Sequence, residues 1–500
     1  MRSKKALKNI ISNLVFQISV IVCNFILPIL IIKTFGSNVN GLLSSITQFL
    51  AYISLIDSGV GAVIKASLYK PIAEKKKEEI QNILYASNRF FKIIASIFIV
   101  YIVVLCFIYP HFINSTFDTW FTVSLIIILS FSTFCEYFFG MSYRLFLQVD
   151  QKTYIISNIQ TIVTILNAIV VVVLVNLNCS IQIVKLGASL VFILRPIIQN
   201  LYVRKKYNIS FKKADKNYKI AKKWDGLVQH VAFVIHNNTD TAILSFFSLT
   251  YVSIYAVYSL VVRAIKSLTG SFTSGIEASF GDMYVKGEIE HLNKSFKTYE
   301  IFYLTIITIV FACTFTLITP FVSVYTRHVT DANYYQPLFG YILVISEYVY
   351  MMRLPYSGLT YAVGHFKETR RGAWVEALSN IILSIILVYK YQLVGVVIAT
   401  TIAMTIRTIE FAYHTSKYIL KRGFRTSIKM FSVFAIEFTI SVLVCGLLPK
   451  LTSLTYFAWI IEALMVFVIT VLIVLIINNI FYGEERKNLY SLVKRIIFKK

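Results

Sequence analysis

The chain is built from repeated apolar runs, each about 20 residues long. The first six lie near residues 9–33, 41–66, 90–112, 120–146, 153–176 and 181–203. A second series lies near 225–249, 252–274, 299–323, 337–361, 373–390 and 393–416, and two more runs lie near 428–448 and 456–482. Runs of this length cross a bilayer as helices, whereas the strands of a membrane barrel alternate over about ten residues. The sequence therefore predicts an all-α polytopic membrane protein with about fourteen transmembrane helices.

The basic residues set the predicted orientation. The formal net charge of +25 suits either nucleic acid or anionic lipid as a partner. The cations, however, gather in alternate connecting segments, namely Lys75–Lys77, Arg204–Lys223, Lys367–Arg371 and Lys421–Arg425. The segments 113–119 and 177–180 between them hold no Lys or Arg. This is the positive-inside pattern, so we expect both termini in the cytoplasm, membrane lipids as partners and no nucleic-acid partner.

The spacing of the runs indicates two similar halves. An ungapped shift of the chain places Ile64-Lys65-Ala66-Ser67 on Ile276-Glu277-Ala278-Ser279, and each half has the same number of runs. We predict an N-terminal lobe over 1–203, a basic cytoplasmic connector over 204–224 and a C-terminal lobe over 225–417. Residues 418–500 would add two helices and a basic cytoplasmic tail.

The segments outside the runs are too short for a soluble catalytic domain. The six cysteines lie in or beside apolar runs without a Cys-x-x-Cys or Cys/His cluster, so neither zinc nor a disulfide framework is indicated. We therefore expect no cofactor and no enzymatic activity. A membrane-embedded polysaccharide polymerase is the alternative from another functional class, although no metal-binding acidic motif supports it.

Several stretches resemble the polysaccharide transporter branch of the multidrug/oligosaccharidyl-lipid/polysaccharide flippase superfamily, which contains the O-antigen, capsule and teichoic acid flippases. The stretches are Phe35-Gly36, Gly41, Leu55–Gly61, Asn237–Asp240 and Val252–Tyr258. The resemblance implies two pseudo-symmetric six-helix lobes around a central cavity that opens alternately to either side, with two C-terminal helices beside them. The implied substrate is an oligosaccharide or a teichoic acid precursor on undecaprenyl pyrophosphate. The implied location is the bacterial cytoplasmic membrane, with glycan-assembly proteins as further partners.

Charged residues inside the apolar runs are the candidates for substrate binding, because a charge in the hydrocarbon core is costly unless it faces a cavity or a partner. Arg263 lies near the middle of the eighth run, Lys266 follows one turn later, and no acid lies within one turn. Two stacked cations suit a pyrophosphate. Lipid II flippases, which are related to the family named above, carry an arginine in the corresponding helix. The alternative is an ion pair with an acid of another run, such as Asp57 or Glu347.

The complete candidate substrate-binding set is Arg263, Lys266, Arg195, Arg353 and Asp57. In contrast, Arg407 and Glu410 are predicted to form a structural ion pair, because they are three residues apart on one helix.

A cation site is a second candidate. Asp240 ends a polar string in the seventh run, and relatives in the family place a cation among the seventh, eleventh and twelfth helices. The corresponding oxygen-bearing residues are Asn380, Thr400 and Thr401. The eleventh run has Glu376 as its acid and no Asp, so both Na⁺ and H⁺ remain open as coupling ions, as does a purely structural hydrogen-bonding role.

The nearest competing function is a cation-coupled multidrug exporter of the same superfamily. Such an exporter would share the twelve-helix core but would need an acidic or aromatic cavity for cationic drugs. The cations Arg263 and Lys266 and the two extra runs favour the flippase instead.

Overall fold

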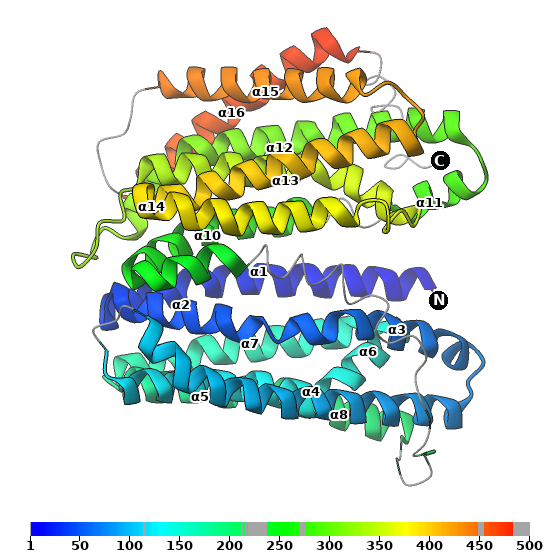
Figure 1. The fold of residues 1–500 in the computed structure, drawn as a ribbon, viewed down its shortest axis with the longest axis vertical. Helices are drawn as coiled ribbons and strands as arrows, with labels where there is room; N and C mark the ends of the chain where they lie inside the picture. Colours follow the sequence, from blue (N-terminus) through cyan, green and yellow to red (C-terminus); the bar gives the residue numbers. More distant parts are fainter. Residues whose placement is uncertain are drawn as a thin grey trace. The chain divides into compact units, whose positions relative to one another are not determined.

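The computed structural model describes residues 2–113, 117–209, 238–270, 277–448 and 455–483, together with 211, 214, 215 and 218. Over these residues the chain is helical and contains no β-strand (Figure 1). Continuous helices satisfy every internal backbone donor and acceptor, which is what a hydrocarbon solvent requires. The predicted all-α fold class is therefore confirmed.

Ten of the described helices are long and apolar enough to cross a membrane. They account for ten of the predicted spans. The others coincide with α2 and α3, with α13, with the second half of α14 and with the helical residues 238–247. The predicted seventh span, 225–249, lies mostly outside the described residues. The chain is thus a multi-pass membrane protein, with helix positions close to those expected from hydropathy.

Contacts between Cα atoms divide the chain into two compact units, Met1–Ala256 and Val257–Lys500. The division falls inside helix α10 (Leu249–Gly270). The predicted lobes, connector and tail are defined by topology rather than by compactness, so those boundaries stay predictions.

The first unit is a series of helices that pack on one another. Its elements are α1 (Arg2–Phe35), α2 (Ser37–Ala51), α3 (Ser54–Ala73), α4 (Lys77–Phe112), α5 (Thr119–Cys135), the π-helix η1 (Glu136–Gly140), α6 (Met141–Val149), α7 (Thr153–Asn176) and α8 (Ile181–Tyr207). Helix α1 packs on α7, α7 on α8, α8 on α5, α5 on α4 and α4 on α3. The second predicted span, 41–66, is interrupted at Tyr52 and Ile53, whose amides bond three residues back rather than four.

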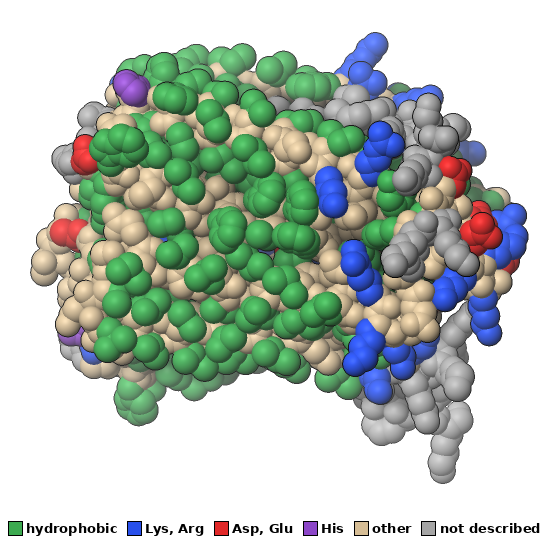
Figure 2. All heavy atoms as spheres, turned by 90° about the horizontal axis from the view of Figure 1, so that it is seen from below, with side chains coloured by type: hydrophobic (Ala, Val, Ile, Leu, Met, Phe, Trp, Pro, Cys, Tyr) green, Lys and Arg blue, Asp and Glu red, His purple; other side chains and the backbone are tan. Residues whose placement is uncertain are grey.

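The outer face of the first unit has the surface expected for contact with lipid. Figure 2 shows hydrophobic side chains over most of this face and Lys and Arg gathered toward one end. Helix α4 exposes large apolar side chains, among them Val100 at 63% and Phe107 at 73%. In water such a surface would aggregate, whereas in a bilayer it is solvated by acyl chains.

The second unit contains the remaining described helices. They are the second part of α10, α11 (Glu277–Val285), α12 (Ile289–Tyr325), α13 (Pro337–Ala362), α14 (Arg370–His414), the π-helix η3 (Thr415–Ile419), α15 (Arg425–Gly446) and α16 (Tyr456–Phe481). Helix α12 packs against α13, α15 and α16, and α13 packs most extensively against α14 (Figure 1). The two C-terminal helices are thus anchored to this unit through α12.

Helix α14 is a hairpin of two helices rather than one straight rod. Gln392 has φ 49° and ψ −126°, which breaks the helical path. Asn380 donates a hydrogen bond to Thr400 over 2.8 Å, although a straight helix would separate these residues by about 30 Å. The two halves correspond to the predicted eleventh and twelfth spans. A Cβ at Gly395 would lie 2.3 Å from the carbonyl oxygen of Leu387, so the turn requires glycine there.

We expect Gly395→Ala to destabilise the protein by about 1–3 kcal/mol, because the added methyl meets a backbone oxygen that cannot move without opening the hairpin. Thermal unfolding of the detergent-purified protein measures the effect. Gly446→Ala is the matched control, because a Cβ at Gly446 would meet no atom within 4 Å. Equal unfolding temperatures for the two variants would show that the hairpin tolerates the methyl group.

Candidate functional site

The candidate site is a line of charged side chains inside the second unit. Helix α13 carries Glu347, Tyr350 and Arg353, each one turn from the next. Helix α10 contributes Lys266, and the two halves of α14 contribute the remaining members. We call the six ionic residues Lys266, Glu347, Arg353, Glu376, Arg407 and Glu410 the charge chain.

The first part of the charge chain links α10 to α13. Lys266 Nζ lies 2.6 Å from Glu347 Oε2. The same ammonium group lies 4.2 Å from the ring centroid of Tyr350. The guanidinium of Arg353 lies 4.5 Å from that centroid, so the one ring contacts both cations.

The second part of the charge chain links α13 to both halves of α14. Arg353 donates to Glu376 Oε1 over 2.6 Å, and Arg407 Nε lies 3.7 Å from Glu376 Oε2. Arg407 also donates to Glu410 and to the backbone carbonyl of Thr369 over 2.6 and 2.7 Å. The predicted pair Arg407–Glu410 is therefore confirmed. Glu376 is the centre of this part, because its two oxygens face two different arginines.

The charges in this second part are buried, so each of them needs its partner of opposite charge. The side chains of Arg353, Glu376 and Arg407 are exposed by 8%, 10% and 4%. A buried ion pair contributes little net stability, yet removal of one partner leaves an uncompensated buried charge. Gly372 also belongs to this arrangement, because a Cβ there would coincide with the Glu410 carboxylate. The packing of α13 on α14 thus depends on charge neutrality within the second unit.

Arg263 differs from the members of the charge chain. It lies on α10 one turn before Lys266, and its side chain is exposed. No hydrogen bond or ion pair to Arg263 occurs within the part of the chain that the structure describes. The charge chain itself has three cations and three carboxylates, so Arg263 is a surplus positive charge beside a neutral line. Of the two interpretations of the stacked cations, the ion pair with Glu347 holds for Lys266 and not for Arg263.

The other candidate substrate residues lie elsewhere. Arg195 belongs to α8 of the first unit, donates to the Thr164 hydroxyl over 2.8 Å and stacks on the Phe192 ring at 4.3 Å. Arg353 is bound to Glu376 as described above. Asp57 lies in α3, and its side chain is outside the described residues.

The structure brings together two of the four candidate cation ligands. Asn380 and Thr400 share the hydrogen bond that crosses the α14 hairpin, and Asn380 Oδ1 is buried with no hydrogen-bond partner among the residues that the structure describes. The Thr401 hydroxyl donates to the carbonyl of Val397 on its own helix. Asp240 belongs to the first unit, where it accepts a hydrogen bond from Tyr255 over 3.0 Å. No group of three or more His, Cys, Asp or Glu suited to a metal occurs in the described ranges.

Two further buried carboxylates lie outside the candidate sets, and of these sequence reasoning missed Glu300. Glu300 of α12 is fully buried, accepts from Arg422 over 2.9 and 3.1 Å and is also bonded to Tyr356. Glu437 of α15 is also fully buried, and neither of its oxygens has a hydrogen-bond partner among the described residues. Glu437 was recognisable as an acid inside an apolar run, but its lack of a partner depends on packing.

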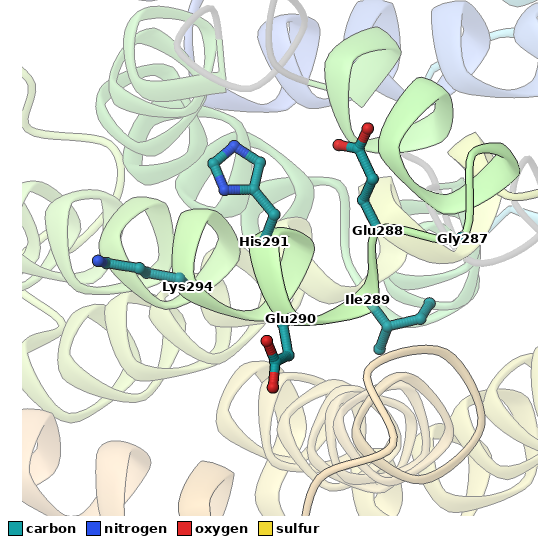
Figure 3. Close-up of a pocket in the computed structure, with 6 residues that line it drawn as sticks. All are labelled: Gly287, Glu288, Ile289, Glu290, His291 and Lys294. Carbon is teal, nitrogen blue, oxygen red and sulfur yellow. The ribbon is translucent and has the colours of Figure 1, made fainter.

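An open depression at the start of α12 is a weaker candidate. It is lined by Gly287, Glu288, Ile289, Glu290, His291 and Lys294. Figure 3 shows the Glu288 and Glu290 side chains pointing in opposite directions from the backbone. The acids therefore do not converge on one ligand, and we assign no function to this depression.

Comparison with known proteins gives the fold. No family model matches the sequence, and no curated protein matches it. Among solved structures, the chain is similar to the lipid II flippase MurJ in an inward closed conformation, with a TM-score of 0.69 and 17% identity over 94% of this chain and 99% of that one. It is also similar to an inward-facing multidrug resistance transporter of the MATE family and the MOP superfamily, with a TM-score of 0.62 and 14% identity over 82% of this chain and 98% of that one.

A third similar structure is a MOP superfamily transporter from Pyrococcus furiosus, with a TM-score of 0.55 and 13% identity over 83% of this chain and 96% of that one. The chain has the MOP-superfamily fold. This is the fold that the resemblance of the motifs in the first, second, seventh and eighth spans implies, so the fold expected from the sequence is confirmed. At these identities the likeness extends to the fold and not to the substrate.

We expect Glu376→Gln to destabilise the protein by about 3–5 kcal/mol, because Arg353 and Arg407 would lose the carboxylate that they share. Membrane yield and thermal unfolding measure the loss. Glu410→Gln is the matched control, with an expected cost of about 1 kcal/mol or less, because the Glu410 side chain is 31% exposed and Arg407 keeps the Thr369 carbonyl. A similar loss in both variants would show that Glu376 has no central role.

Proposed function

We propose that the protein is a flippase that moves an undecaprenyl-pyrophosphate-linked oligosaccharide or teichoic acid precursor across the bacterial cytoplasmic membrane by alternating access. The partners proposed with this function are glycan-assembly proteins and membrane lipids. Similarity in fold to a lipid II flippase over nearly the whole chain supports the proposal. The single observation that carries it is Arg263, an exposed cation without a described partner beside a charge-neutral line.

The chemistry of Arg263 suits a pyrophosphate. A guanidinium has a planar set of donors that matches two phosphate oxygens at once, and it stays charged at any physiological pH. At membrane depth an unpaired guanidinium is costly, and an anionic head group supplies the missing negative charge. Binding of the head group would therefore relieve a cost that the empty protein bears.

A multidrug exporter is the competing function, because structures of that class share the fold. Exporters of cationic drugs need negative charge where the drug binds. The surplus charge at Arg263 is positive, which favours an anionic substrate. A polysaccharide polymerase is the alternative from another functional class, and the similarity in fold to solved transporters favours the flippase over it.

We expect Arg263→Ala to reduce transport by about tenfold to hundredfold, which is the loss of one charge-assisted, bidentate contact. Arg263→Lys keeps the charge without the planar fork and should retain part of the activity. Lys390→Ala is the control, because it removes a cation of the same unit whose described contact is the neighbouring Tyr391 ring. Complementation of a flippase-deficient strain, with membrane levels of each variant, is the measurement. Full complementation by Arg263→Ala at normal expression would contradict the proposal.

We propose further that transport is coupled to Na⁺ or H⁺, with Asp240, Asn380, Thr400 and Thr401 as the candidate ligands. The buried Asn380 Oδ1, which has no hydrogen-bond partner in the described ranges, supports an oxygen ligand at that position. Asp240→Asn should lower transport and abolish any stabilisation by Na⁺, because a ligand that binds the folded state raises the unfolding temperature. Thermal unfolding with NaCl against choline chloride at equal ionic strength measures this. If Asp240→Asn transports and unfolds like the parent in both salts, Asp240 has a structural role.

A further inference from the structure

The ion pair between Lys266 and Glu347 is the least buried of the pairs that link different helices in the charge chain. Its side chains are 22% and 17% exposed, against 8% and 10% for Arg353 and Glu376. A less buried pair costs less to open, whereas removal of one partner from a buried pair leaves an uncompensated charge. The Lys266–Glu347 pair is therefore the one that a ligand can open without disturbing the packing of α13 on α14.

Lys266 has a second contact that does not involve its carboxylate partner. Its ammonium group lies 4.2 Å from the centroid of the Tyr350 ring, and this cation–π contact is independent of Glu347. Tyr350 also contacts Arg353, whose guanidinium lies 4.5 Å from the ring centroid and is bound to the buried Glu376. The ammonium is thus positioned in advance for a second anion, and little ordering is needed when one arrives.

Arg263 and Lys266 lie one turn apart on α10 and form neighbouring positions on its surface. Only one of the two is neutralised by a described acid. An anion that binds Arg263 would find the adjacent cation occupied by a carboxylate of charge −1. A ligand that bears more than one negative charge at adjacent oxygens competes with that carboxylate, while a ligand with a single charge has little to gain from replacing it.

From this geometry we propose that Glu347 is an internal counter-ion that selects polyanionic phosphate head groups by occupying Lys266 until such a head group displaces it. The inference rests on the proposed flippase function and adds the residue that determines specificity. In the exchange the Lys266–Glu347 ion pair opens, a Lys266–phosphate ion pair forms, and no covalent bond changes. The bulk anionic lipids of a bilayer are phosphodiesters with one negative charge. Glu347 would therefore exclude these lipids from Lys266, whereas a pyrophosphate would displace it.

The test compares two probes on the purified full-length chain in neutral-lipid nanodiscs, namely undecaprenyl pyrophosphate and phosphatidylglycerol. Glu347→Gln frees Lys266, so it should tighten phosphatidylglycerol binding by about threefold to tenfold, which is the cost of opening an accessible pair. Pyrophosphate binding should tighten less, because the second charge already overcomes the competitor. The ratio of the two dissociation constants, and with it the selectivity, should therefore fall.

Asp282→Asn is the matched control, because it removes a carboxylate of the second unit whose ion pair, with Lys286, lies outside the charge chain. It should leave both dissociation constants unchanged. The double variant Lys266→Gln/Glu347→Gln should lose the gain of Glu347→Gln, because the cation that the carboxylate blocks is absent. Size-exclusion profiles and unfolding temperatures of each variant exclude a general loss of structure.

Two results would overturn the inference. One is unchanged or weaker binding of both probes to folded Glu347→Gln. The other is a gain for phosphatidylglycerol that persists in the double variant, since it would not pass through Lys266. Failure of the proposed function has a different signature. In that case the parent chain would not bind undecaprenyl pyrophosphate, while Glu347→Gln would still gain affinity for phosphatidylglycerol through Lys266 and support the counter-ion role.

Discussion

Neutralisation of charge inside a low-dielectric medium is the constraint on which the second unit depends. A charged side chain at the bilayer centre costs about 2.5–3.5 kcal/mol on insertion scales unless a partner or water compensates it. Here Glu376 compensates two arginines at once, one from α13 and one from the far half of α14. The α14 hairpin at Gln392 makes this possible, because it reverses the chain direction and brings Arg407 next to Glu376, which lies 31 residues earlier in the sequence. The packing of α13 on α14 places the charges in contact, and the ion pairs in turn stabilise that packing.

The same constraint distinguishes the two cations of α10, Lys266 and Arg263, by whether a carboxylate neutralises them. Where a carboxylate is present, as for Lys266, the cation is satisfied by the protein. No described carboxylate contacts Arg263, so we propose that this cation binds the anionic group of a mobile substrate. Exposure of the side chains rises from 8% and 10% in the Arg353–Glu376 pair to 22% and 17% in the Lys266–Glu347 pair. We propose that the buried pair holds helices together and that the less buried pair responds to a ligand.

Hydropathy predicts most of this fold, because a span is a local property of about 20 consecutive residues. The helix ends of α13, α15 and α16 lie within three residues of the predicted ones. The pair Arg407–Glu410 was also predictable, because residues three apart on a helix are neighbours. The contact of Glu376 with Arg353 was not, because it depends on which faces of α13 and α14 meet. The partner of Lys266 was open for the same reason, since α10 and α13 are far apart in sequence.

Helix α13 is not among the ten helices whose apolar character alone suits a membrane, and it contains both Glu347 and Arg353. Its arginine is synthesised before Glu376, which lies in the next helix along the chain. An isolated α13 would therefore partition poorly into lipid during synthesis. We expect α13 to remain at the insertion machinery until α14 emerges, so that the two helices enter the bilayer together as a neutralised pair. Biogenesis of the second unit would then proceed by helix pairs and not helix by helix, with the ion pair acting as a checkpoint for release.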